Sequence, residues 1–218
     1  MISEFKEMNK LFKEIDETIK DNVHFFIIGG AMLLYHGMKR ATKDIDIVVD
    51  TPNEFKTIKN ALAKLKFSER MPTPEYKKFD LNQIFIREDF RIDLFQRKIC
   101  NGVVLSETMM NRATEVIKLQ HLTISLCSFE DVFLLKTFTE REGDLEDCIS
   151  LAKRGIDWEA LFDEIMNQVK ISDQKVWITW IGERLDILEE KGMIIPIMNR
   201  LNKLREEYYD ELEKKISK

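Results

Sequence analysis

The sequence is poor in the residues that build disulfide frameworks and small metal sites. Its three cysteines, Cys100, Cys127 and Cys148, include no CxxC pair. An odd and widely spaced set predicts neither a disulfide framework nor a zinc site, so we expect reduced and mostly buried thiols. The three histidines likewise show no spacing typical of metal ligands.

Long apolar runs are also missing. The longest, residues 25–28 and 47–49, have the length of a strand and fall far below the roughly 20 residues that cross a bilayer. Residues 1–10 contain Glu4 and Glu7 and no apolar signal core. We therefore expect a cytoplasmic protein that makes no membrane contact.

The chain has no excess of positive charge. Its formal net charge is −5, which argues against broad, non-specific nucleic-acid binding, because Lys and Arg supply most of that affinity. A local basic groove remains compatible with this balance. With 218 residues, 44% hydrophobic and 33% charged, the chain has the composition of one sizeable core or two modest domains.

Residues 24–49 are the most informative stretch. They predict a buried strand, a Gly29-Gly30 turn, a short helix, a basic loop and a second strand that opens with Asp44 and Asp46. A glycine turn between a strand and a helix exposes backbone N–H groups that suit phosphate oxygens. Asp44 and Asp46 lie two residues apart, so on a strand their side chains leave the same face. This combination indicates a metal–nucleotide site.

The rest of the first half completes a mixed α/β pattern. Apolar spacing predicts a helix over residues 2–20, and Thr51-Pro52-Asn53-Glu54 is a capping box that starts a helix to about residue 66. Residues 83–87 and 90–95 read as a hairpin whose second arm places Arg91, Asp93 and Phe95 on one face. Residues 115–118 and 122–126 are short strand candidates.

From Ser128 onward the pattern is helical. Gly143, Gly155 and Gly192 separate expected helices of roughly 10 to 20 residues, and Asp157 and Ser172 are expected N-caps. The last helix, residues 196–216, has one apolar stripe that packs on its own domain or forms a homodimer contact. We predict an α+β fold: a nucleotide-binding α/β domain over residues 1–126, with a small mixed sheet and flanking helices, and an all-helical domain over residues 127–218.

The order of these motifs resembles the polymerase-β-like nucleotidyltransferase superfamily. Gly29-Gly30 is followed after thirteen residues by Asp44-Ile45-Asp46 and then by Asp93 on a later strand. The segment Gly37-x-x-Arg40-x-Thr42-x-Asp44-Ile45-Asp46 looks most like AbiEii-type toxins and minimal nucleotidyltransferases. The helical segment with Lys136, Arg141, Asp144 and Asp147 is similar to a motif of the same proteins. The position of Gly30 is often Ser in this superfamily, so a hydroxyl that could contact phosphate is absent there.

The resemblance implies the role of each site residue. Asp44, Asp46 and Asp93 would be catalytic and would hold Mg²⁺ or Mn²⁺, and Asp93 could also accept the acceptor's proton. The residues that would bind the nucleoside triphosphate are Gly29, Gly30, Arg40, Lys43 and Lys136. The reaction would move a nucleoside monophosphate to an unknown acceptor hydroxyl on RNA, protein or a small molecule.

Other interpretations stay open on the sequence alone. Each aspartate alone could be a solvated surface acid, and Lys136 with its acidic neighbours could form structural ion pairs. The whole protein could be a catalytically quiet nucleotide-binding module, related to a toxin–antitoxin pair. It could also be an RNA-binding or protein-binding module in which the acidic site is vestigial.

Overall fold

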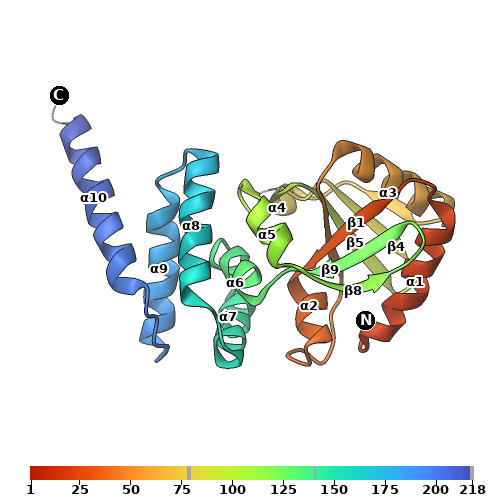
Figure 1. The fold of residues 1–218 in the computed structure, drawn as a ribbon, viewed down its shortest axis with the longest axis horizontal. Helices are drawn as coiled ribbons and strands as arrows, with labels where there is room; N and C mark the ends of the chain where they lie inside the picture. Colours follow the sequence, from red (N-terminus) through yellow and green to blue (C-terminus); the bar gives the residue numbers. More distant parts are fainter. Residues whose placement is uncertain (78–79, 140, 217–218) are drawn as a thin grey trace. The chain divides into compact units, whose positions relative to one another are not determined.

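The computed structural model describes residues 1–77, 80–139 and 141–216. The chain divides into two compact units, Met1–Ser128 and Phe129–Lys218, and each is described by itself. The first unit contains a mixed sheet with flanking helices and the second is helical, so the protein has the α+β fold expected from the sequence (Figure 1). None of the described helices has the length and apolar character needed to cross a membrane.

The first unit is built from the following elements. Its helices are α1 (Phe5–Thr18), α2 (Gly29–Tyr35), α3 (Pro52–Lys64), α4 (Pro74–Lys77) and α5 (Glu107–Arg112). Its strands are β1 (Val23–Ile28), β2 (Ile45–Val49), β3 (Ser68–Arg70), β4 (Gln83–Arg87), β5 (Phe90–Gln96), β6 (Lys98–Ile99), β7 (Val103–Val104), β8 (Thr114–Lys118) and β9 (Leu122–Leu126).

Seven strands form one sheet in the order β3-β4-β5-β2-β1-β9-β8, and β6 and β7 form a separate pair. β1 runs antiparallel to β2 and parallel to β9, while β2 runs parallel to β5. Strands β1 and β2 therefore lie in the middle of the sheet, which places the Gly29-Gly30 turn and the acidic residues beside its centre.

Helices α1 and α3 cover one face of this sheet (Figure 1). Phe12 of α1 contacts Phe25 of β1, with ring centroids 6.4 Å apart. α3 begins at the expected capping box: the Thr51 hydroxyl accepts from the Glu54 N–H, and the Glu54 carboxylate accepts from the Thr51 N–H. Each such cap contributes about 1 kcal/mol.

The second unit is a set of helices. They are α6 (Phe129–Thr137), α7 (Glu142–Arg154), α8 (Trp158–Ser172), α9 (Trp177–Glu190) and α10 (Met198–Ile216). Asp157 caps α8 as expected, because its carboxylate accepts from the N–H groups of Glu159 and Ala160. The N-cap expected at Ser172 is wrong. Ser172 is the last residue of α8, where its hydroxyl donates to the Gln168 carbonyl, and α9 begins later.

Glycines and cysteines fit the expectations with one exception. Gly155 and Gly192 follow helices and have positive φ, but Gly143 lies in the first turn of α7 and separates nothing. Cys127 and Cys148 are buried reduced thiols, and Cys100 is half-buried and also reduced.

Candidate functional site

The acidic residues lie on the sheet face opposite α1. Asp46 of β2 and Asp93 of β5 are direct register partners on adjacent parallel strands. Neighbouring strands are about 4.8 Å apart and register partners project to the same face, so the two carboxylates are next to each other. Ile45, Ile47 and Val49 alternate with Asp46 and are fully buried, which fixes the face that Asp46 uses.

Asp44 lies just outside β2, which begins at Ile45. The expectation that the strand opens with Asp44 is therefore wrong by one residue. The hydroxyl of Thr42 donates to the Asp44 carbonyl at 3.0 Å, so a side chain helps to hold the backbone here. The charge of Asp44 still acts on its neighbours, since it raises the pKa of both Asp93 and Arg91.

Gly29 packs directly against one of these carboxylates. Its φ is +65°, and a Cβ placed there would overlap Asp46 Oδ2 and lie 3.1 Å from Asp46 Cγ. Only glycine suits a position that combines a left-handed backbone with this close approach. The turn after β1 and the acidic strand β2 are thus packed as one unit, with backbone N–H groups and carboxylate oxygens at the same place.

Sequence reasoning did not assign a role to Arg91, although it placed Arg91 and Asp93 on one face of β5. Arg91 Nε donates to Asp93 Oδ1 at 2.7 Å and its Nη2 donates to Oδ2 at 2.6 Å. The guanidinium also lies over the ring of Tyr76, 5.0 Å from the centroid. The sequence could have predicted this pair, because opposite charges two residues apart on a strand lie on the same face.

These contacts set the proton affinity of the pair. Asp93 is only 3% exposed, and this burial raises the pKa of its carboxyl, although the two hydrogen bonds and the charge of Arg91 oppose the rise. The hydrogen bonds to Asp93 raise the pKa of Arg91, so the guanidinium stays charged. The site therefore contains a buried carboxylate whose affinity for a proton exceeds that of an exposed aspartate.

The predicted cations lie in different environments. Arg40 and Lys43 are exposed on the loop between α2 and β2. Lys136 belongs to the second unit, where its Nζ lies 2.7 Å from Asp144 Oδ1 and 2.6 Å from Asp147 Oδ2. Lys136, Asp144 and Asp147 are all buried, so the ion pairs considered from the sequence are present. The role of Lys136 in binding nucleotide stays a prediction.

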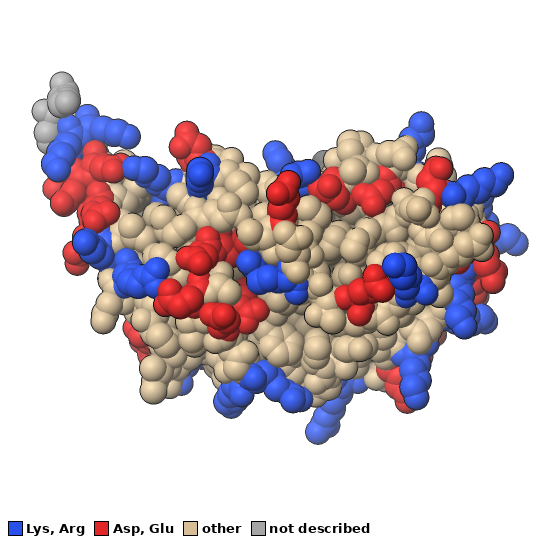
Figure 2. Space-filling model, in the orientation of Figure 1, with Lys and Arg blue, Asp and Glu red and all other residues tan. Residues whose placement is uncertain are grey.

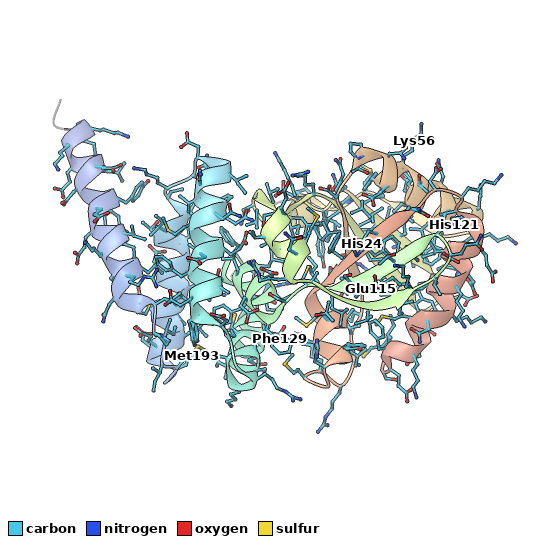
Figure 3. The ribbon with its side chains drawn as sticks, viewed as in Figure 1. His24, Lys56, Glu115, His121, Phe129 and Met193 are labelled. Atoms are coloured by element: carbon cyan, nitrogen blue, oxygen red, sulfur yellow. The ribbon has the colours of Figure 1, made fainter. Side chains whose placement is uncertain are left out.

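The sheet face opposite α1 also carries a histidine outside the predicted site. His24 of β1 and Glu115 of β8 come from the strands on either side of β9, and both are labelled in Figure 3. His24 Nε2 lies 2.8 Å from the Ser125 hydroxyl, and its ring stacks on Phe26 with centroids 4.2 Å apart. Burial lowers the pKa of His24, and the charges of Glu54 and Glu115 only partly offset this effect.

The surface carries charges of both signs. On the face drawn in Figure 2, basic and acidic side chains are interspersed over the surface. Over residues 1–77, 80–139 and 141–216, no group of three or more His, Cys, Asp and Glu side chains is close enough to hold a metal ion.

Comparison with known proteins shows the family. The model of the family described as "Nucleotidyltransferase of unknown function (DUF6036)" matches residues 6–190. The crystal structure of ANT(2")-Ia in complex with adenylyl-2"-tobramycin has a TM-score of 0.52 at 11% identity, covering 73% of this chain and 94% of the other. A solution structure of the antibiotic-resistance factor ANT(2'')-Ia gives a TM-score of 0.54 at 11% identity, covering 78% and 94%.

At such low identity the two solved structures are similar in fold alone. A search of curated proteins gave no match. The family match covers both compact units except their outer ends, and it agrees with the nucleotidyltransferase superfamily indicated by the glycine and aspartate motifs. The chain belongs to the DUF6036 family of nucleotidyltransferases, and the protein is a nucleotidyltransferase.

Proposed function

We propose that the protein moves a nucleoside monophosphate from a nucleoside triphosphate to an acceptor hydroxyl, with Mg²⁺ or Mn²⁺ as cofactor. One observation carries this proposal: Asp46 and Asp93 are register partners on adjacent parallel strands, and Asp46 packs on Gly29. This arrangement supports the proposal, because transfer of a phosphorus group needs phosphate-binding groups close to carboxylates, and the Gly29 turn lies against one of the two paired carboxylates.

The residues present fit a divalent cation. Mg²⁺ prefers hard oxygen ligands and keeps several waters, so one or two carboxylates with substrate phosphates are enough to hold it. Asp46 and Asp93, the adjacent pair, would supply these ligands, and Asp44 would join them, although the described residues contain no ready-made site of three clustered ligands. Arg91 uses one lone pair on each Asp93 oxygen, and each oxygen retains another. When bound, the ion would polarise the attacking and leaving oxygens.

The chain's own groups account for the remaining steps. The acceptor oxygen forms a bond to the α-phosphorus while the bond from that phosphorus to the β-phosphate bridge breaks and pyrophosphate leaves. Asp93 would accept the proton of the acceptor hydroxyl, because its carboxylate lies beside Asp46 on the same face of the sheet. The N–H groups of Gly29 and Gly30 bind the terminal phosphates, and Arg40 and Lys43 neutralise their charge.

The acceptor determines the biological role of the transfer reaction. The ANT(2")-Ia crystal structure is a complex with adenylyl-2"-tobramycin, so ATP with tobramycin is the first pair to test. An RNA end and a protein side chain are the other acceptors. Resemblance to AbiEii-type toxins makes a toxin–antitoxin role the matching prediction for an RNA or protein acceptor. A homodimer contact through residues 196–216 also stays a prediction.

Label transfer tests the proposal directly. The protein is incubated with each α-labelled ribonucleoside triphosphate, Mg²⁺ or Mn²⁺, and either tobramycin or a cell extract. We expect transfer by the native protein and a loss of at least about 10²-fold in the double variant Asp44→Asn with Asp46→Asn. A matched control is Asp50→Asn, since Asp50 follows β2 and pairs with Arg97, with 2.8 Å between Nη1 and Oδ1. Equal transfer by the native protein and the double variant would contradict the proposal.

A second candidate, a nucleotide-binding module without turnover, is favoured by the Arg91–Asp93 pair. Both oxygens of the buried carboxylate already have a charged partner. This function predicts that a triphosphate raises the melting temperature without forming product, since ligand that binds only the native state stabilises it. A melting scan with the four triphosphates, run beside the transfer assay, separates the two functions.

A further inference from the structure

The loop that leads into β2 passes over the second glycine of the phosphate turn. A Cβ placed at Gly30 would lie 2.5 Å from Thr42 Oγ1 and 3.3 Å from Thr42 Cβ. The threonine side chain therefore fills the space that any side chain at position 30 would need. This contact disfavours a side chain at position 30, where the backbone lacks the positive φ of Gly29.

Thr42 is held in this place from three directions. Its N–H donates to the Ile2 carbonyl at 2.9 Å, and its carbonyl accepts from the Ile2 N–H at 3.0 Å. Its hydroxyl donates to the Asp44 carbonyl at 3.0 Å. The residue is 6% exposed, and Ile2 is 1% exposed, so the bridge between them is buried. These three hydrogen bonds restrain both the backbone and the side chain of Thr42.

We propose that Thr42 is a positioning residue of the transfer reaction, which sets the distance between the phosphate turn at Gly30 and the carboxylate of Asp44. The inference rests on the proposed function. The hydroxyl oxygen and Cβ of Thr42 pack on Gly30, and the same hydroxyl donates to the backbone carbonyl of Asp44. Without the hydroxyl, the residue before β2 loses the hydrogen bond that this side chain donates to its carbonyl.

Three single variants test the role of the hydroxyl. Thr42→Val keeps the shape and removes the hydrogen bond, so kcat for transfer should fall about fivefold to tenfold, with a smaller change in KM for the triphosphate. Thr42→Ser keeps the hydroxyl and should recover most of this loss. The control is Thr179→Val in α9, which removes a hydrogen bond of the same kind, 2.7 Å long, from a threonine that is 4% exposed.

A structural role alone would give another pattern. Thr42→Val and Thr179→Val would then lower the melting temperature by similar amounts and leave kcat and KM within about twofold of the native protein. That result would overturn the proposal. A Thr42→Ser variant as impaired as Thr42→Val would overturn it as well, since the hydroxyl would then have no part in the effect.

The contact with Gly30 has its own test, which does not depend on activity. Gly30→Ala should destabilise the native protein strongly because the new methyl meets Thr42 Oγ1. The same change should destabilise less in a Thr42→Ala background, where that oxygen is gone. The measured quantity is the non-additivity of the free energies of unfolding in a double-mutant cycle. Additive effects would overturn the proposal, because the two residues would not be coupled.

Failure of this inference and failure of the proposed function give different results. If triphosphates neither stabilise the native protein nor donate label, the proposed function fails and this inference fails with it. If the native protein transfers label and Thr42→Val does so equally well, only the inference fails.

Discussion

Arg91 and Asp93, two residues apart on β5, form a forked ion pair with donor–acceptor distances of 2.7 and 2.6 Å. The side chain of Asp93 is 5% exposed and that of Arg91 is 26% exposed, so the carboxylate lies deeper than the cation. Bidentate pairs of this kind are among the stronger charge-assisted hydrogen bonds. The guanidinium keeps the carboxylate oriented on the sheet face that carries Asp46.

Removing this cation should destabilise the protein and reduce transfer. Arg91→Gln leaves a buried carboxylate without its charged partner, which costs about 3–5 kcal/mol when a buried pair is broken. Asp93→Asn in the same background should restore part of the stability, because both charges are then absent, but not the transfer. Urea unfolding of the two single variants and the double variant measures this coupling. Equal stability of Arg91→Gln and the native protein would contradict it.

Gly29 and Gly37 provide a matched pair of glycine substitutions. Both have positive φ, +65° and +69°, but a Cβ at Gly37 has no heavy atom within 4 Å, whereas one at Gly29 overlaps Asp46. Each alanine should cost about 1–2 kcal/mol of backbone strain. Only Gly29→Ala should also reduce transfer, by about 10²-fold, because it displaces the Asp46 carboxylate. Melting curves and label transfer on both variants check this. Similar activity in the two would show that Asp46 tolerates the shift.

Lys136 should contribute strongly to the stability of the helical unit. Burial lowers the pKa of Lys136, but the charges of Asp144 and Asp147 raise it overall. Burial raises the pKa of Asp144, yet Lys136 and the hydrogen bonds of Thr139 and Arg141 bring it to about 2. Lys136→Met should therefore destabilise the protein by about 3–5 kcal/mol at pH 7. Urea unfolding measures the change, with the exposed Lys153→Met as control, which should stay within about 0.5 kcal/mol.

The same cluster should show a defined dependence on acid. The pKa of Asp144 lies below its ordinary value of 3.8, so its contribution is present above that pH and is lost as pH falls toward about 2. The stability difference between native protein and Lys136→Met should therefore shrink from pH 4 to pH 2. A difference that stays constant over this range would show that the pair contributes by packing and not by charge.

His24 should make stability depend on pH in a higher range. Its pKa is lowered by burial, so the unfolded chain binds a proton more readily than the native protein. Stability should rise with pH from the folded pKa up to the ordinary value near 6.5, and each unit of lowering contributes about 1.4 kcal/mol. Urea unfolding between pH 5 and pH 7 should show a smaller rise in His24→Gln than in the native protein. If stability rises equally with pH in both proteins, groups other than His24 cause the pH dependence.

Local pattern was sufficient for the elements that surround the site. The apolar spacing of α1, the capping box at Thr51 and the hairpin of β4 and β5 each depend on residues close together in the chain, and each formed as expected. The Gly29-Gly30 turn after a buried strand was visible for the same reason. The local pattern gave a wrong prediction at Ser172. Its hydroxyl suits an N-cap, but in the structure it donates to the Gln168 carbonyl one turn earlier in the same helix.

The sequence by itself determined the nucleotidyltransferase family and the identity of the candidate residues, because order and spacing of the glycine and aspartate motifs are properties of the chain. Only the tertiary structure decided that Asp46 and Asp93 are register partners. It also decided that Arg91 forms an ion pair with Asp93 and that Thr42 packs against Gly30. Register between β2 and β5 depends on pairing across more than forty residues, which no local pattern specifies. Packing of the sheet sets this register, and the register sets the distance between Asp46 and Asp93 on which the proposed chemistry depends.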